Sequence, residues 1–247
     1  MGKRFKGKTC AYCAVAGIAN TGDHVLARAF LPVKHRGQIP QVPACTTCNK
    51  EKSDLEHYAA TILLFGGRHP DSLGNLTNDA PRRLAKNQKL HRELAASATR
   101  VWSKQPSGIL VRTTALPVDG ERLVKLVGLI VRGLMFHHWD IVLGPDINVD
   151  VLSLTQYGER FFEQMRTWNA KQRVAGNIGD GALVYTGAQG VDTATISIWE
   201  LSLLGGAVLA GSPKEGSTSR FGVMTGPKAI SERANDRIRR GAFIIRP

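Results

Sequence analysis

The stretch "CTTCNKEKSD", residues 45–54, holds a Cys-x-x-Cys pair that runs directly into a helix-like sequence. A second pair, "CAYC" at residues 10–13, lies before it, and the two pairs enclose residues 14–44. In a reducing compartment, such pairs are more typical of metal ligands than of disulfides. Four thiolates form a closed tetrahedral site, which is structural because no position is left for water or substrate. The sequence therefore predicts a structural zinc ion held by Cys10, Cys13, Cys45 and Cys48.

The composition is that of a globular protein. The chain has 247 residues, of which 43% are hydrophobic and 21% charged. Its longest apolar runs are too short to span a membrane, and the basic start "MGKRFKGKT" is followed by cysteines and polar residues rather than by the apolar core of a signal peptide. We therefore expect a cytoplasmic protein with no membrane partner.

The charge is strongly positive. There are 33 Lys and Arg against 20 Asp and Glu, giving a net charge of +13. An excess of this size favours a polyanionic partner, and DNA is the partner that we expect. A basic surface that serves only solubility is the alternative.

The pattern along the chain predicts an α+β protein in three parts. Residues 1–66 form the zinc-containing unit, whose helix has apolar residues on one face and ends at Gly66-Gly67. Residues 67–106 form a basic helical connector, in which "RRLAKNQKLHRELAASATRVW", residues 82–102, reads as helical. Its cations form either a solvated face or a contact with the DNA backbone. They are Arg82, Arg83, Lys86, Lys89 and Arg92.

Residues 107–247 are expected to form an α+β domain with a small antiparallel sheet. Strands are predicted near 109–118 and 147–154. Three more are predicted near 181–187, 194–206 and 207–212, where apolar residues alternate and glycines separate the segments. Helices are predicted over 119–139 and 157–169, and a basic helix-like tail over 228–247. No residue pattern assigns this domain a role. It could hold the target, sense a signal or form a homodimer.

The enclosed segment contains "TGDHVLARAFLP", residues 21–32. The triplet Asp23-His24-Val25, Pro32, the Cys45-x-x-Cys48-Asn49 pattern and the Asn49-x-x-Lys52 start of a helix together resemble the HNH endonucleases, most closely their four-cysteine members. The resemblance covers residues 8–58. It implies that the N-terminal unit is a zinc-stapled ββα-metal (HNH) fold.

The resemblance also implies the roles of individual residues. His24 would be the general base, and Asp23 with Asn49 would bind a catalytic Mg²⁺ or Mn²⁺ ion. The asparagine that orients the base in this family has no counterpart in "VKHRGQIPQVPAC", residues 33–45, so Gln38, Gln41 or a backbone group would replace it. Neighbouring cations would contact phosphates of the nucleic acid. They are Arg28, Lys34, Arg36, Lys50 and Lys52.

The predicted function is metal-dependent endonucleolytic hydrolysis of DNA phosphodiester bonds. Two alternatives stay open: a non-catalytic zinc-knuckle protein that binds nucleic acid, and a nuclease that acts on RNA. One geometric condition applies to the nuclease. Side chains of adjacent strand residues point to opposite faces, so Asp23 and His24 can serve one site only if the chain turns there or the phosphate straddles the strand edge.

Overall fold

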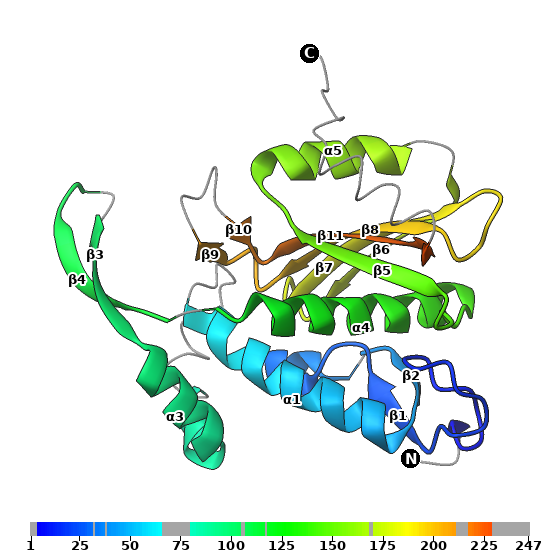
Figure 1. The fold of residues 1–247 in the computed structure, drawn as a ribbon, viewed down its shortest axis with the longest axis horizontal. Coiled ribbons are helices and arrows are strands. Elements are labelled where there is room, and N and C mark those ends of the chain that lie inside the picture. Colours follow the sequence, from blue (N-terminus) through cyan, green and yellow to red (C-terminus); the bar gives the residue numbers. More distant parts are fainter. Residues whose placement is uncertain are drawn as a thin grey trace.

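The computed structural model describes most of the chain, namely residues 4–31, 33–37, 39–65, 80–104, 107–116, 118–167, 170–210 and 217–228. These residues form a mixed α+β structure in layers (Figure 1). Strands β1 (Thr21–His24) and β2 (Gln41–Ala44) with helix α1 (Thr46–Ile62) form one side. Helix α4 (Gly120–Trp139) lies in the middle, and a five-stranded sheet covers its other side.

The N-terminal part is a two-stranded hairpin followed directly by a helix. β1 and β2 pair antiparallel, with Asp23 opposite Val42 and His24 opposite Gln41. Their long connection contains the short 3-10 helices η2 (Arg28–Phe30) and η3 (Val33–His35), and a third, η4 (Leu63–Phe65), extends the end of α1. Packing requires a glycine at position 22, since a Cβ atom there would lie 2.6 Å from the Phe5 ring.

The sequence of helix α4 is apolar over most of its circumference because the helix is covered on two sides. It packs between α1 and the sheet, and Leu126, Val127 and Ile130 are fully buried. The side chain of Asp119 caps its first turn by accepting a hydrogen bond from the backbone N–H of Arg122. The helix ends where Asp140 adopts a left-handed conformation, with φ of 54°.

The sheet is antiparallel throughout, in the order β5-β11-β8-β7-β6, and α5 (Gln156–Thr167) packs on the face away from α4. The predicted strands and both predicted helices of this part are present. Three strands of this part had not been predicted, namely β6, β10 and β11. The strands are β5 (Ile147–Ser153), β6 (Ala170–Ile178), β7 (Leu183–Gly190), β8 (Ser197–Leu203) and β11 (Arg220–Pro227), with a separate small pair β9 (Val208–Ala210) and β10 (Ser217–Thr218).

The connector differs from the prediction at its end. Residues 80–86 are helical, and α3 (Gln88–Ser97) follows with Asn87 as its N-cap. The predicted helix should have continued to Trp102, but the chain instead forms β3 (Thr99–Lys104), which pairs with β4 (Leu110–Ala115) as a hairpin. Thr99, Val101 and Trp102 are β-branched or aromatic and favour a strand.

Buried residues of the N-terminal unit, α4 and the sheet join one hydrophobic cluster. The boundaries at 66 and 106 therefore do not separate independent cores, and the division into three parts stays a prediction. Gly66 and Gly67 and nearly all of the basic tail lie outside the described residues. Among the helices described, none is long and apolar enough to cross a membrane.

Candidate metal centre and active site

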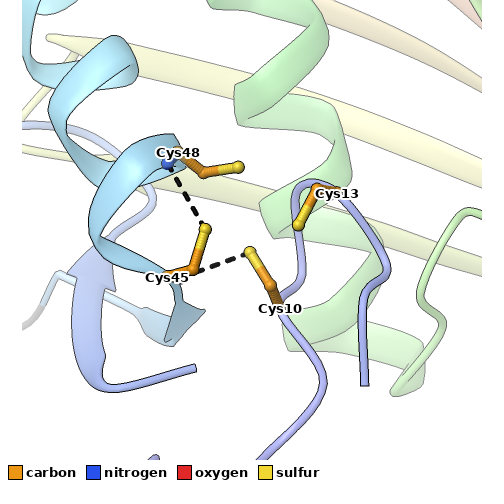
Figure 2. A group of neighbouring side chains, drawn as sticks. All are labelled: Cys10, Cys13, Cys45 and Cys48. Carbon is orange, nitrogen blue, oxygen red and sulfur yellow. Dashed lines mark hydrogen bonds between the residues drawn. The ribbon is translucent and has the colours of Figure 1, made fainter. Parts of the chain in front are cut away.

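The four cysteines converge at the end of the β1–β2–α1 unit. Cys10 and Cys13 come from the loop before β1, whereas Cys45 caps α1 and Cys48 lies in its first turn. Figure 2 shows the four side chains pointing toward one another. Their sulfur atoms all lie within 4.8 Å of one another. Sulfurs bound to a single zinc ion at about 2.3 Å would lie about 3.8 Å apart, so the cluster needs only a small contraction to hold zinc.

The electrostatics of the cluster also suit a cation. All four cysteines are free thiols. The backbone N–H of Cys45 lies 3.4 Å from the sulfur of Cys10, and that of Cys48 lies 3.4 Å from the sulfur of Cys45. Burial raises the pKa of the Cys48 thiol, and its neighbouring thiols raise it further. Burial also raises the pKa of Cys10, but backbone hydrogen bonds bring it below its ordinary value. A divalent metal ion would supply the positive charge that compensates four thiolates in one place.

Arg132 provides a positive charge near the cluster. Burial lowers the pKa of its guanidinium group, while electrostatic attraction to Cys13 and Cys48 raises it. Its position on α4 is fixed by a hydrogen bond of 2.6 Å to the carbonyl oxygen of Leu143. A zinc ion with four thiolates carries a net charge of −2, which a nearby guanidinium stabilises. No sequence pattern pointed to this residue.

Asp23 lies inside the protein, where two donors hold one of its carboxylate oxygens. Oδ2 accepts a hydrogen bond of 2.6 Å from the Tyr12 hydroxyl and lies 3.0 Å from Nζ of Lys52. Burial and the Asp23 charge raise the pKa of Tyr12 well above its ordinary value, so Tyr12 stays neutral and donates. Within the described part of the chain, Oδ1 accepts no hydrogen bond, and the Asp23 side chain is 12% exposed. Oδ1 is therefore the carboxylate oxygen of Asp23 that has no partner among these residues.

Lys52 is the centre of this buried network. Its side chain is fully buried, and Nζ also donates to Oε1 of Glu56 at 2.6 Å and to the carbonyl oxygen of His24 at 2.7 Å. Burial raises the pKa of Glu56 to about 7, although attraction to Lys52 opposes the shift. Lys52 thus joins α1 to both residues at the end of β1.

Lys52 had been predicted to contact phosphate, and the structure gives it a different place. A side chain with no exposed surface, whose ammonium group already has three partners, offers nothing to a nucleic acid. Its hydrogen bonds compensate for the cost of burying a charge. We therefore correct the prediction: Lys52 holds the site together from inside.

His24 lies on the other face of β1, as the alternation of a strand requires. It is half-buried, and its Nε2 lies 2.9 Å from the side-chain nitrogen of Gln41, its cross-strand neighbour. Burial lowers the pKa of His24, and the positive charges of Arg28 and Lys52 lower it further, whereas Asp23 raises it. The imidazole is therefore neutral at pH 7. Of the two glutamines expected to replace the missing asparagine, Gln41 contacts the histidine, and Gln38 lies outside the described residues.

Asn49 lies in the first turn of α1, next to Cys48, and is half-buried. Its backbone N–H donates to the carbonyl oxygen of Cys45 at 3.0 Å, and among the described residues its side chain makes no hydrogen bond. Asn49 precedes Lys52 by three residues, so both lie on the same side of the helix. Since Lys52 reaches Asp23, Asn49 lies one helical turn from the Asp23 contact.

The other expected phosphate contacts lie nearer the surface. Arg28, Lys34 and Lys50 are exposed. Arg36 is half-buried and donates from Nε to the carbonyl oxygen of Leu31 at 3.0 Å. Four of the five predicted residues are therefore at least partly available to a polyanion, and Lys52 is the exception.

Comparison of the chain with known protein families, with characterised proteins and with solved structures finds no match to any of them. The residues themselves therefore carry the resemblance to HNH endonucleases. Tyr12 and Glu56 complete the site but were not predicted. Glu56 follows Lys52 by four residues, the spacing of an ion pair on a helix, which was the one available sequence signal.

Proposed function

We propose that this protein is a metal-dependent endonuclease that hydrolyses DNA phosphodiester bonds. The observation that carries the proposal is the joint placement of a four-cysteine cluster, an oriented neutral histidine and a buried carboxylate within one β1–β2–α1 unit. A structural zinc ion on Cys10, Cys13, Cys45 and Cys48 would fix the start of α1 against the hairpin.

His24 acts as the general base in this proposal. A base must be neutral at the working pH and have one ring nitrogen free. The lowered pKa of His24 meets the first requirement. The Gln41 carboxamide would have to be flipped from the orientation described above, so that its oxygen instead of its nitrogen meets Nε2–H. Nδ1 is then left to take the proton from the attacking water, and Gln41 replaces the missing asparagine.

Asp23 and Asn49 would bind the catalytic Mg²⁺ or Mn²⁺ ion through oxygen atoms, which are the ligands these ions prefer. The free Oδ1 of Asp23 and the unengaged side chain of Asn49 support this role. The ion supplies stabilisation of the charge that develops on the leaving oxygen. The opposite faces of Asp23 and His24 require the scissile phosphate to straddle the end of β1, where the chain bends at Val25 and Leu26.

Cleavage of supercoiled plasmid tests the proposal. With Mg²⁺ or Mn²⁺, the wild type is expected to produce nicked or linear DNA, and His24→Ala to lose about 10²- to 10⁴-fold in rate while retaining DNA binding. His57→Ala, an exposed histidine on α1, is the matched control and should cleave normally. Equal rates for wild type and His24→Ala would remove His24 from the mechanism. An RNA of the same sequence, cleaved faster than the DNA, would make RNA the substrate.

A non-catalytic zinc protein that binds nucleic acid is the second candidate. The observation that favours it is the engagement of Asp23 by Tyr12 and Lys52, which already compensates the carboxylate without a metal ion. Plasmid that stays supercoiled with both metals, at protein concentrations that clearly bind it, would support this second function.

A further inference from the structure

Helix α3 and the β3–β4 hairpin that follows it form an arm that has no part in the proposed chemistry. Helix α3 leads directly into β3, and Figure 1 shows the β3–β4 hairpin extending away from the layered body. Leu90 and Leu94 of α3 are buried, so the helix is anchored, whereas the hairpin exposes large apolar side chains. Trp102 is 68% exposed and Leu110 60%. With Ile109, which is 63% exposed, these side chains form a group of exposed large apolar residues on one hairpin, and such a group indicates a contact surface.

One face of the hairpin combines this tryptophan with cations. Arg100 pairs with Thr114, and Trp102 pairs with Arg112. Residues two apart on a strand, and residues directly opposite on its partner, share a face. Arg100, Trp102 and Arg112 therefore lie on one face, and all three are exposed. Within the described ranges, neither arginine has an acidic partner.

The charge of the arm identifies the kind of partner. Residues 82–115 contain eight Lys or Arg and one acidic residue, Glu93, so this short segment carries +7 of the chain's net charge of +13. Not all of these cations are free. Arg83 donates to the carbonyl oxygens of Ala60 and Ala29 and thereby fastens the connector to α1 and η2. The remaining surface still complements a polyanion.

Trp102 indicates which kind of polyanion fits this surface. A regular duplex hides the faces of its bases and presents phosphates, whereas a single strand presents both phosphates and base faces. Aromatic side chains stack on exposed bases while arginines bind the backbone. We propose that the face formed by Arg100, Trp102 and Arg112 binds single-stranded DNA, with a base on Trp102 and phosphates on the arginines. The inference rests on the proposed function, for which it supplies a substrate preference.

Binding without cleavage tests this inference. Fluorescence anisotropy with a labelled single strand and the matching duplex, in buffer without Mg²⁺ or Mn²⁺ and at several salt concentrations, measures affinity and its salt dependence. Trp102→Ala should weaken single-strand binding by about 5- to 150-fold, the range for loss of one stacked base, and Trp102→Phe should restore most of it. Arg100→Gln with Arg112→Gln should lower the slope of log affinity against log salt by about 1.4. Lys171→Gln, an exposed cation on β6, is the control and should bind normally.

Unchanged affinity and salt slope in the hairpin variants would overturn the inference, as would an equal loss for single strand and duplex. A native dimer that dissociates with Trp102→Ala, measured by light scattering, would also overturn it by making the hairpin a contact between two copies. The absence of Mg²⁺ and Mn²⁺ separates this test from the proposed function, because binding is then measured where no cleavage is expected. If the protein binds single strands through the hairpin but never cleaves DNA, only the proposed nuclease function is contradicted. If the protein cleaves DNA but the hairpin variants bind normally, only the proposed role of the hairpin is contradicted.

Discussion

Nζ of Lys52 lies 3.0 Å from Oδ2 of Asp23, in a position fully shielded from solvent. The same ammonium group binds Glu56 and the backbone of His24, so a single buried charge joins the helix α1 to both candidate catalytic positions on β1. An uncompensated buried charge is costly, and this network therefore makes the site's geometry and the stability of the N-terminal unit depend on each other.

Removal of the buried ammonium group tests this dependence. Lys52→Met is expected to reduce the free energy of unfolding by about 3–5 kcal/mol, because two buried carboxylates lose their positive partner. Lys50→Met, an exposed position on the same helix, should change it little. Urea unfolding measures both variants. Similar midpoints for the two would show that the buried network contributes no stability.

The pH dependence of stability tests Glu56. Its folded-state pKa of about 7 lies above the ordinary value of 4.5, so between these pH values the unfolded chain releases the proton that the folded protein keeps. Stability of the wild type relative to Glu56→Gln is therefore greatest below about pH 4.5, falls as the pH rises toward 7, and then levels off. Asp54→Asn, at an exposed position on α1, is the control. If the difference in stability between the wild type and Glu56→Gln does not vary with pH, the pKa of Glu56 is not raised in the folded protein.

The pH dependence of cleavage tests the environment of His24. Burial and Arg28 both lower the pKa of this histidine, so the acidic limb of the wild-type rate profile should lie below pH 6.5. Arg28→Gln removes one of these causes and should move the limb toward higher pH. Because Arg28 is also an expected phosphate contact, the rate is compared under saturating DNA. A limb that stays in place or moves to lower pH would contradict the account.

Arg132 tests the outer environment of the cysteine cluster. Purified protein is expected to contain one zinc ion per chain, and Arg132→Met to weaken zinc retention by about 10- to 100-fold, since a charge near the thiolates is lost. Competition with a coloured chelator measures the affinity. Lys125→Met on the same helix, whose ammonium group pairs with Glu51, should retain zinc normally. Equal retention in both variants would exclude a role for Arg132 at the centre.

The sequence was informative where one physical constraint dominates. The spacing of Cys10, Cys13, Cys45 and Cys48 predicted a cluster that the structure assembles, because tetrahedral coordination demands two close pairs of ligands. The alternation of β8, buried on every second residue, likewise predicted a strand with one face in the core. The prediction that the side chains of Asp23 and His24 point to opposite faces of the strand followed from strand geometry alone.

Features that depend on distant partners could not be predicted. β6 lies at the edge of the sheet, where most of its residues are exposed, so it has no strong apolar alternation. The end of the helical run at Ser97 depends on the pairing of β3 with β4, since Ala95 and Ala96 themselves favour a helix. Lys52 looked like a surface cation because lysine is almost never fully buried unless it is paired.

The most direct test of the central claim is diffraction from crystals of the zinc-loaded protein soaked in Mn²⁺, with data collected at the manganese and zinc absorption edges. The account predicts a manganese signal within coordination distance of Oδ1 of Asp23 and the side-chain oxygen of Asn49, with zinc confined to the four cysteines. A soaked crystal with zinc at the cysteines and no manganese at either oxygen would contradict the proposed catalytic site.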